Sequence, residues 1–295
     1  MQEKEAGQTC SAGGHAAPRD ARQAEEQERR LRERVGGIAH TIVVLSGKGG
    51  VGKSTVAVNL ALGLARSGMK VGLLDADIHG PSVPLMLGLE GAGVKSDGQS
   101  IQPVPYAHGL KVMSIGFLLG GRDEAVIWRG PLKMGVLKQF LSDVAWGELD
   151  YLVVDLPPGT GDEPLSICQL MPAADGAVVV TTPQQIAITD VRKCVTFCRK
   201  LGLPVLGVVE NMSGFVCPHC GERSEVFGSG GGERMAEEMG VPFLARIPMD
   251  AEVMHSCEAG GPYVERHEGT EPARAFQAVC KVALALKAPQ DGCCE

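Results

Sequence analysis

A glycine-rich loop near residue 50 constrains the fold more than any other feature of the sequence. It comes directly after the apolar run 42–45 and Ser46, and it precedes a helical pattern. The loop matches G-x-x-x-x-G-K-[S/T] in the strand–loop–helix context that this pattern requires. Its residues are Gly47, Lys48, Gly49, Gly50, Val51, Gly52, Lys53, Ser54 and Thr55. Because such glycines let backbone N–H groups converge on phosphate oxygens at a helix N-terminus, the sequence predicts a nucleotide phosphate site.

Two side chains of this loop are expected to act on the phosphates and on their metal ion. Lys53 offers a mobile cation, and Ser54 offers a hydroxyl group to Mg²⁺. The alternative is a chance match, since the chain contains 40 glycines. The flanking strand and helix patterns argue against chance, and we expect Mg-ATP at this site.

Short runs of apolar and β-branched residues recur along the chain and predict strands buried on both faces. They occupy 42–45, 71–74, 151–154, 177–180, 205–209 and 243–247. Helical patterns alternate with them, at 54–66, 132–146, 186–201 and 233–239. This alternation predicts an α/β fold, a doubly wound and mostly parallel sheet with helices on both faces.

The ends of the chain are predicted to be tails around a single domain. Residues 1–36 are polar, with one locally helical stretch, and predict a flexible N-terminal tail. The domain is expected over 37–288, and 289–295 form a tail that carries Cys293 and Cys294.

Composition excludes some classes of protein. The net charge of -7 argues against nucleic-acid binding, which needs a basic surface. The apolar runs are too short to span a membrane, so no membrane association is expected. The chain has ten cysteines but begins with a polar stretch in place of a secretion signal. We therefore expect a cytoplasmic protein with reduced thiols.

Carboxylates follow two of the predicted strands. Asp75 and Asp77 come after the run 71–74, and Asp155 comes after 151–154. Ligands of open α/β sheets bind at these carboxyl ends. Asp155 is therefore the expected carboxylate on the Mg²⁺ side, and the amide of Gly159 is a candidate contact for a γ-phosphate. A cap or turn role remains the alternative for each aspartate taken alone.

Several motifs together resemble one known family. The loop contains a second lysine, Lys48, and further motifs read Asp-Ala-Asp-Ile-His-Gly-Pro-Ser at 75–82, Asp-Leu-Pro-Pro-Gly-Thr-Gly-Asp at 155–162 and Glu-Asn-Met-Ser at 210–213. From about residue 37 to 288, the chain resembles the Mrp/ApbC iron–sulfur cluster carriers. These belong with MinD, ArsA and the nitrogenase iron protein among the ATPases with a deviant Walker A motif.

This resemblance implies roles for individual residues. It implies a sandwich homodimer in which Lys48 reaches the nucleotide of the partner. Lys48, Lys53 and Asp77 would then be the catalytic residues, with Asp77 positioning the attacking water. The resemblance further implies that Asn211 hydrogen-bonds adenine and that Pro248 lies against the base.

A Cys-x-x-Cys motif lies in a loop predicted at 212–226. Cys217 and Cys220 are spaced to hold one metal ion or one edge of a cluster. An iron–sulfur cluster, a structural zinc ion and a redox dithiol are all compatible with this motif. The pair is half of a four-ligand site, and the other half could come from Cys293 and Cys294 or from a second copy of the chain. The resemblance favours a [4Fe-4S] cluster that bridges two subunits.

The N-terminal segment differs from that of some relatives. Eukaryotic cytosolic members of the family carry four spaced cysteines there, whereas this segment contains only Cys10. A second, N-terminal cluster is therefore not predicted.

The sequence is compatible with three functions. The favoured one is an ATP-hydrolysing carrier that delivers its cluster to apo iron–sulfur proteins. The alternatives are a positioning ATPase similar to MinD and ParA, and an ATP-dependent reductase similar to the nitrogenase iron protein. Weak basic character and the Cys217–Cys220 pair count against the positioning ATPase, but the sequence does not separate a cluster donor from an electron donor.

Overall fold

The computed structural model describes residues 18–286 apart from residues 99, 119–129, 172 and 218. Cys10, Cys293 and Cys294 lie outside the described residues. Within them, nine strands form one sheet in the order β10-β9-β8-β1-β7-β2-β6-β5, and β11 pairs with β9. These strands are β1 (Ile38–Ser46), β2 (Val71–Asp75), β5 (Val104–Pro105), β6 (Lys111–Ser114), β7 (Leu149–Asp155), β8 (Gly176–Thr181), β9 (Val205–Val216), β10 (Arg223–Ser224) and β11 (Phe243–Met249). A separate pair consists of β3 (Lys95–Ser96) and β4 (Ile101–Gln102).

The sheet is mostly parallel, as predicted. Only the edge strands β5 and β10 run antiparallel to their neighbours. The central strand β1 lies between β7 and β8, and Ile42, Val43, Val44 and Leu45 in it have no exposed surface. Such runs of apolar residues suit a strand that is covered by helices on both faces.

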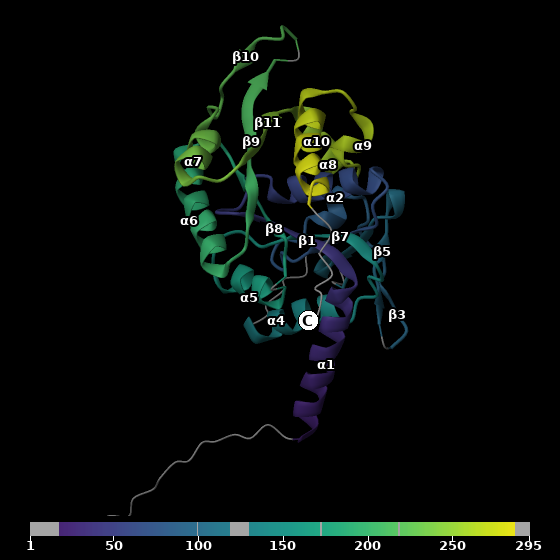
Figure 1. The fold of residues 1–295 in the computed structure, drawn as a ribbon. Coiled ribbons are helices and arrows are strands. Elements are labelled where there is room, and N and C mark those ends of the chain that lie inside the picture. The colour runs from purple at the N-terminus through teal and green to yellow at the C-terminus, as the bar shows by residue number, and fades with distance from the viewer. Residues whose placement is uncertain (1–17, 99, 119–129, 172, 218, 287–295) are drawn as a thin grey trace, which may run out of the picture.

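Helices cover both faces of the sheet (Figure 1). They are α1 (Pro18–Gly36), α2 (Lys53–Arg66), α3 (Val83–Met86), α4 (Gly130–Ser142), α5 (Asp162–Leu170), α6 (Gln185–Leu201), α7 (Gly231–Met239), α8 (Ala251–Glu258), α9 (Tyr263–Arg266) and α10 (Glu271–Leu284), with 3₁₀ turns at Ala107–Gly109 and Ile115–Phe117. The chain leaves β1 toward β2 but leaves β8 in the opposite direction along the sheet, toward β9. Right-handed crossovers therefore place α2 and α6 on opposite faces. Both meet the sheet with apolar side chains, and α10 packs against α2 and β11.

The helix α1 differs from the flexible tail predicted for residues 1–36. It packs against α4, and Leu31 is only 6% exposed. Lys138 donates to Glu28 over 3.1 Å, and Arg30 lies 3.7 Å from Asp143. Apolar burial and these ion pairs hold the last turns of α1 on the domain.

The helix predicted at 132–146 ends at Ser142 instead. Beyond it, Val144 forms an isolated bridge with Ile101. The Ile101 amide donates to the carbonyl of Asp143, and the Ala145 amide donates to the carbonyl of Ile101. These backbone groups are therefore not available for the hydrogen bonds of a further helical turn.

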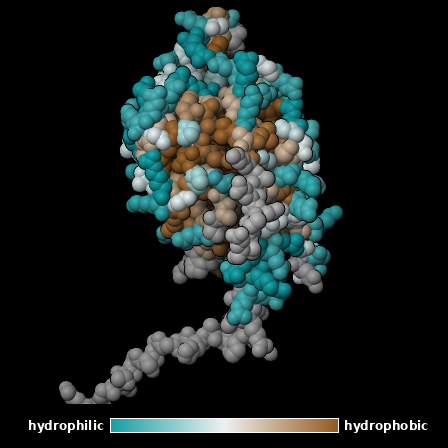
Figure 2. All heavy atoms as spheres, in the orientation of Figure 1, coloured by the Kyte–Doolittle hydropathy of each residue, from teal (hydrophilic) through white to brown (hydrophobic). Residues whose placement is uncertain are grey.

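The surface is divided between apolar and hydrophilic regions (Figure 2). Hydrophilic side chains dominate α1, whereas apolar side chains gather over β9 and β11 on the face shown. Among the described residues, no helix combines the length and the apolar character that crossing a membrane requires.

Candidate functional site

The glycine-rich loop connects the buried end of β1 to the first turn of α2, as predicted. Gly50 and Gly52 adopt left-handed backbone conformations, with φ of 77° and 82°. The Ser46 hydroxyl donates to the carbonyl of Lys48 over 2.9 Å and fixes the start of the loop. The loop therefore turns tightly above the positive end of the α2 dipole, where an anion is stabilised.

At two positions of the loop, contacts with segments distant in sequence leave no room for a side chain, which explains why glycine occurs there. A Cβ atom on Gly52 would lie 2.1 Å from Nδ2 of Asn211, and one on Gly47 would lie 2.6 Å from Asp190 of α6. A side chain at either position would displace the loop from β9 or from α6.

A cradle of about 250 Å³ lies at this loop, and most of the predicted phosphate contacts surround it. It is lined by Ser46, Lys48, Gly49, Gly50, Gly52, Lys53, Ser54, Thr55, Asp77, Gly80, Ser82, Met86 and Pro158. The fold thus brings Lys48, Lys53, Ser54 and Asp77 to one hollow. Sequence reasoning did not anticipate Ser82 and Met86.

Lys53 and Asp155 form a buried ion pair. Lys53 Nζ donates to Asp155 Oδ1 over 2.6 Å and to Ser54 Oγ over 3.2 Å. Asp155 is fully buried, and its Oδ2 atom has no hydrogen-bond partner among the described residues. Burial raises the pKa of Asp155, and the Lys53 ammonium opposes this rise. An unpartnered carboxylate oxygen near the Ser54 hydroxyl fits a Mg²⁺ ion, which prefers oxygen ligands.

Asp75 lies beside Asp155 on the neighbouring strand, in register with it. Its carboxylate accepts hydrogen bonds from the Ser114 hydroxyl at 3.0 Å, the Asp77 amide at 3.1 Å and the Val83 amide at 3.3 Å. Burial, followed by the charge of Asp155, raises the pKa of Asp75 to about 7. Asp75 therefore anchors the segment that carries Asp77.

Gly159 does not line the cradle. Its amide donates to the carbonyl of Ser46 over 2.8 Å, and its φ is 94°. A contact between this amide and a γ-phosphate, as predicted, would require that hydrogen bond to open.

A second hollow adjoins the cradle and shares Gly52, Thr55 and Met86 with it. It encloses about 580 Å³ and contains both residues predicted to contact adenine, Asn211 and Pro248. Its remaining lining comes from α3, α8, β9 and the segments beside them: Leu85, Met212, Phe215, Phe227, Met249, Asp250, Ala251, Val253, Met254, Cys257 and Glu258. We call this hollow the base cavity.

Asn211 makes a contact that the sequence did not reveal. Its Nδ2 atom donates to the carbonyl of Val51 over 2.9 Å, so β9 is tied to the glycine-rich loop. Its neighbour Glu210 is fully buried and accepts hydrogen bonds from Ser213 Oγ and from the amides of Gly230 and Gly232. Glu210 therefore joins β9 to the first turn of α7.

Cys217 and Cys220 lie in the turn that joins β9 to β10, at the tip of this hairpin. The hairpin of β9 and β10 is seen at the top of Figure 1. The hairpin is closed by pairing of Val216 with Arg223, and Cys217 and Glu222 are joined by a backbone hydrogen bond of 2.9 Å. Cys220 is exposed and Cys217 is half-buried. Pro218 lies outside the described residues.

The electrostatics of the tip favour thiolate. The amide of Cys220, then the amide of His219 and the Cys220 thiol, lower the pKa of Cys217 through hydrogen bonds. Thiolate is the form that binds metals. Among the described residues no group of three or more His, Cys, Asp or Glu side chains is arranged to hold a metal ion. The tip thus carries two free thiols, at Cys217 and Cys220.

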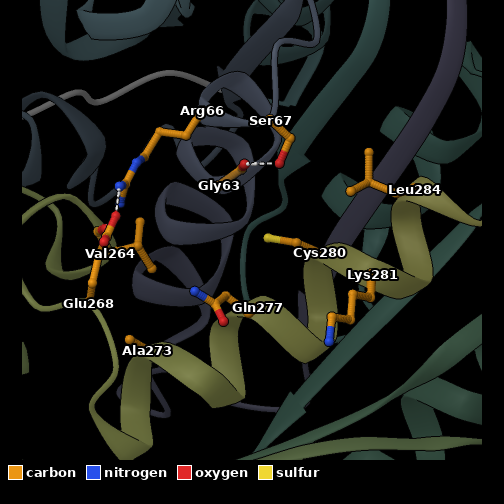
Figure 3. A pocket seen from close by; sticks show the side chains of 10 residues that line it. All are labelled: Gly63, Arg66, Ser67, Val264, Glu268, Ala273, Gln277, Cys280, Lys281 and Leu284. Atoms are coloured by element: carbon orange, nitrogen blue, oxygen red, sulfur yellow. Dashed lines mark hydrogen bonds and ion pairs between the residues drawn. The ribbon is translucent and has the colours of Figure 1, made fainter.

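The other described cysteines are packing residues, apart from Cys257 in the base cavity. Burial raises the pKa to about 12 for Cys194, Cys198 and Cys280 and to about 11 for Cys168. Cys280 borders a third hollow of about 340 Å³ at the end of α2 remote from the glycine-rich loop, and its side chain points toward Gly63 (Figure 3). At this hollow Arg66 is paired with Glu268.

The raised pKa values keep the thiols of Cys168, Cys194, Cys198 and Cys280 protonated, as is usual for cysteines that pack in a core.

Comparisons with known proteins agree with this geometry. The family model of the NUBPL iron-transfer P-loop NTPases, within the ParA group, matches residues 37–284. An iron–sulfur cluster carrier protein from Methanocaldococcus jannaschii is 52% identical over 239 residues, 81% of this chain and 82% of that protein. The cytosolic Fe-S cluster assembly factor NUBP2 of Homo sapiens is 51% identical over 251 residues, 84% of this chain and 92% of that protein.

Solved structures show the same fold. A nucleotide-binding protein from Archaeoglobus fulgidus, in complex with ADP, aligns with a TM-score of 0.71 and 42% identity, covering 83% of this chain and 98% of that chain. The cell division ATPase MinD of Pyrococcus furiosus aligns with a TM-score of 0.60 and 26% identity, with coverage of 83% and 98%.

Proposed function

Because this chain belongs to the family of NUBPL iron-transfer P-loop NTPases, we propose that it hydrolyses ATP slowly and carries a [4Fe-4S] cluster to apo iron–sulfur proteins. The names of its relatives, an iron–sulfur cluster carrier and a cytosolic Fe-S cluster assembly factor, support this cargo. The second of these names also supports a cytosolic location.

The nucleotide would bind across the cradle and the base cavity. In this proposal the loop amides and Lys53 hold the phosphates, and adenine enters the base cavity between Asn211 and Pro248. Ser54 and Asp155 would hold Mg²⁺, which would neutralise phosphate charge. Asp77 orients the attacking water from the edge of the cradle.

Lys53 must exchange partners when the nucleotide binds. It is now bonded to Asp155 at 2.6 Å, with both side chains buried. Phosphate would draw the ammonium away, and Asp155 would then need a cation in its place, because an unpaired buried carboxylate is costly. This exchange supports a site that binds nucleotide and Mg²⁺ together.

The proposed cluster site rests on one observation: the thiols of Cys217 and Cys220 lie together on an exposed hairpin tip. Backbone amides that point at the Cys217 sulfur favour its thiolate and would also hydrogen-bond a cluster. Exposure allows a recipient protein to reach the cargo. Two thiolates satisfy half of a [4Fe-4S] cluster, so we propose a homodimer in which each copy supplies one pair. Lys48 would then face the partner's nucleotide.

Anaerobic reconstitution with iron and sulfide tests this function. The expected product is brown and holds about four irons per dimer. The loaded protein should then restore the activity of an apo iron–sulfur enzyme while a chelator is present. A protein that stays colourless excludes the cluster, and one that keeps its iron while reducing the acceptor is a reductase.

A further inference from the structure

The second half of β9 links the glycine-rich loop to the thiol pair. Asn211 on β9 contacts the loop through the carbonyl of Val51 at 2.9 Å, and Cys217 directly follows the last residue of the strand. The same strand therefore touches both halves of the proposed site, six residues apart along the chain.

The stretch between these two points is irregular. Along β11, Ile247 pairs with Asn211 and Met249 with Phe215, so two steps on β11 match four on β9. The extra residues form a bulge at 212–214, where Met212 has a φ of 56° and Gly214 a φ of 73°. A left-handed methionine is strained, and it persists only where surrounding contacts hold it.

Those contacts are present on both sides of the bulge. Ser213 Oγ donates to Glu210 over 2.6 Å, and the amide of Gly214 donates to Gly228 over 3.3 Å. Glu210 also accepts from the Gly230 amide at 2.7 Å, so the segment that returns from the hairpin is bonded to the same carboxylate. The bulge and the base of the hairpin are thus one hydrogen-bonded unit.

The bulge also forms a wall of the base cavity. Met212 and Phe215 both line it, and Phe215 pairs with Ser224 of β10. Phe227, which follows β10, lines the same cavity. A base that enters the cavity would therefore pack against β9 and against the segment that follows β10, at the root of the hairpin.

We propose that the bulge Met212–Gly214 is a positioning element that transmits occupancy of the base cavity to the Cys217–Cys220 tip. This inference rests on the proposed nucleotide site. A base in the cavity restrains Met212 and Phe215 and so orders the hairpin, which couples nucleotide binding to the presentation of the two thiols. The ligand must interact differently with the ordered and the loose hairpin for such coupling to exist.

The test measures thiol reactivity in the full-length, reduced, metal-free protein. Alkylation of Cys217 and Cys220 by N-ethylmaleimide is followed by mass spectrometry with and without ADP. The protein concentration is one at which sedimentation shows the same assembly state in both conditions. ADP should slow alkylation by about fivefold or more, and alkylated protein should in turn bind ADP more weakly, because coupling between two sites acts in both directions.

In the Met212→Gly variant, the alkylation rate with ADP should equal the rate without ADP. Glycine lacks the side chain that lines the cavity, and it leaves the backbone of the bulge free to move. Met212→Asn should also reduce the difference between the alkylation rates with and without ADP. Because asparagine tolerates the left-handed backbone, this variant should still fold, and it therefore tests the contact between the Met212 side chain and the base. The matched control is His108→Gly, since His108 is the other described non-glycine residue with positive φ, at 57°. That variant should keep the wild-type ratio of rates.

Two results would overturn the inference. One is wild-type protein that binds ADP yet alkylates at an unchanged rate. The other is both Met212 variants keeping the wild-type ratio. Because this assay needs no cluster, failure of iron–sulfur reconstitution would reject the proposed cargo and leave the coupling test intact.

Discussion

Lys53 Nζ donates to Asp155 Oδ1 over 2.6 Å, and both side chains are almost completely withdrawn from solvent. In such a pair the attraction is offset by the cost of removing both charges from water, and loss of one partner leaves the other uncompensated. The pair therefore links the stability of the domain to the residue that is expected to hold phosphate.

Lys53→Ala should lower both the free energy of unfolding and the affinity for ATP. The stability loss should be about 3 kcal/mol near pH 8 and smaller at pH 5, because burial raises the pKa of Asp155 and a lower pH favours its uncharged form, which needs no cation. Urea denaturation at the two pH values measures this. Ser54→Ala is the control, with a stability change of about 1 kcal/mol and loss mainly of Mg²⁺-dependent binding. Normal ATP turnover in both variants would reject the nucleotide site.

Asp77→Asn should bind ATP but hydrolyse it poorly. Asp77 lines the cradle and is only partly buried, and its amide, not its carboxylate, holds the strand end through Asp75. The variant therefore keeps the loop geometry and loses the group proposed to orient water. Equilibrium binding of a fluorescent ATP analogue and single-turnover hydrolysis separate the two effects. An equal loss of binding would show that Asp77 has a structural role.

The buried carboxyl of Asp75 predicts a pH dependence of stability. Its folded-state pKa of about 7 lies above the unfolded value near 3.8. The native state therefore binds a proton that the unfolded state releases, so stability is fully present below about pH 4 and falls as the pH rises toward 7. Asp75→Asn should flatten this slope. Urea unfolding of both proteins from pH 5 to 8 checks it, and parallel curves for the two would contradict the prediction.

Local patterns were sufficient to predict which residues lie together in one part of the candidate site. The glycine-rich loop, Lys53, Ser54 and Asp155 follow from residues that are adjacent in sequence or end a predicted strand, because parallel strands bring their carboxyl ends to one edge. The alternation of strands and helices likewise gave the sheet and most helix positions. Such features depend on short-range pattern and are visible in one sequence.

Local sequence patterns could not predict the base cavity or the packing of α1. Leu85, Phe227, Met254 and Cys257 come from separate segments and carry no shared pattern, and only the folded chain brings them together. Leu31 is one apolar residue in a polar stretch, and its burial depends on where α4 lies. The bulge in β9 depends on pairing with β11, which no local spacing reveals.

Cluster loading should strengthen the proposed homodimer. A ligand that bridges two copies stabilises the assembly that binds it, so the dissociation constant of the dimer should fall on loading. Sedimentation velocity of apo and reconstituted protein over a range of concentrations measures this. A monomer in both states would exclude a bridging cluster. Chelation of the iron should return the loaded protein to the apo distribution.

The source of the sulfur ligands can be decided with four variants of the chain. Cys217→Ser or Cys220→Ser should abolish the visible absorbance after reconstitution, because a hydroxyl is a far poorer ligand than a thiolate for cluster iron. Cys168→Ser on α5 is the matched control, since burial raises the pKa of that thiol to about 11 and it should not bind iron. Removal of Cys293 and Cys294 should leave most of the absorbance if a second copy supplies the missing pair. Should the tail deletion remove the cluster while the hairpin variants keep it, the assignment is wrong, and the hairpin is then a zinc or redox element. Iron and sulfide analysis of each variant, alongside its absorbance, distinguishes these outcomes, because zinc would leave the protein colourless.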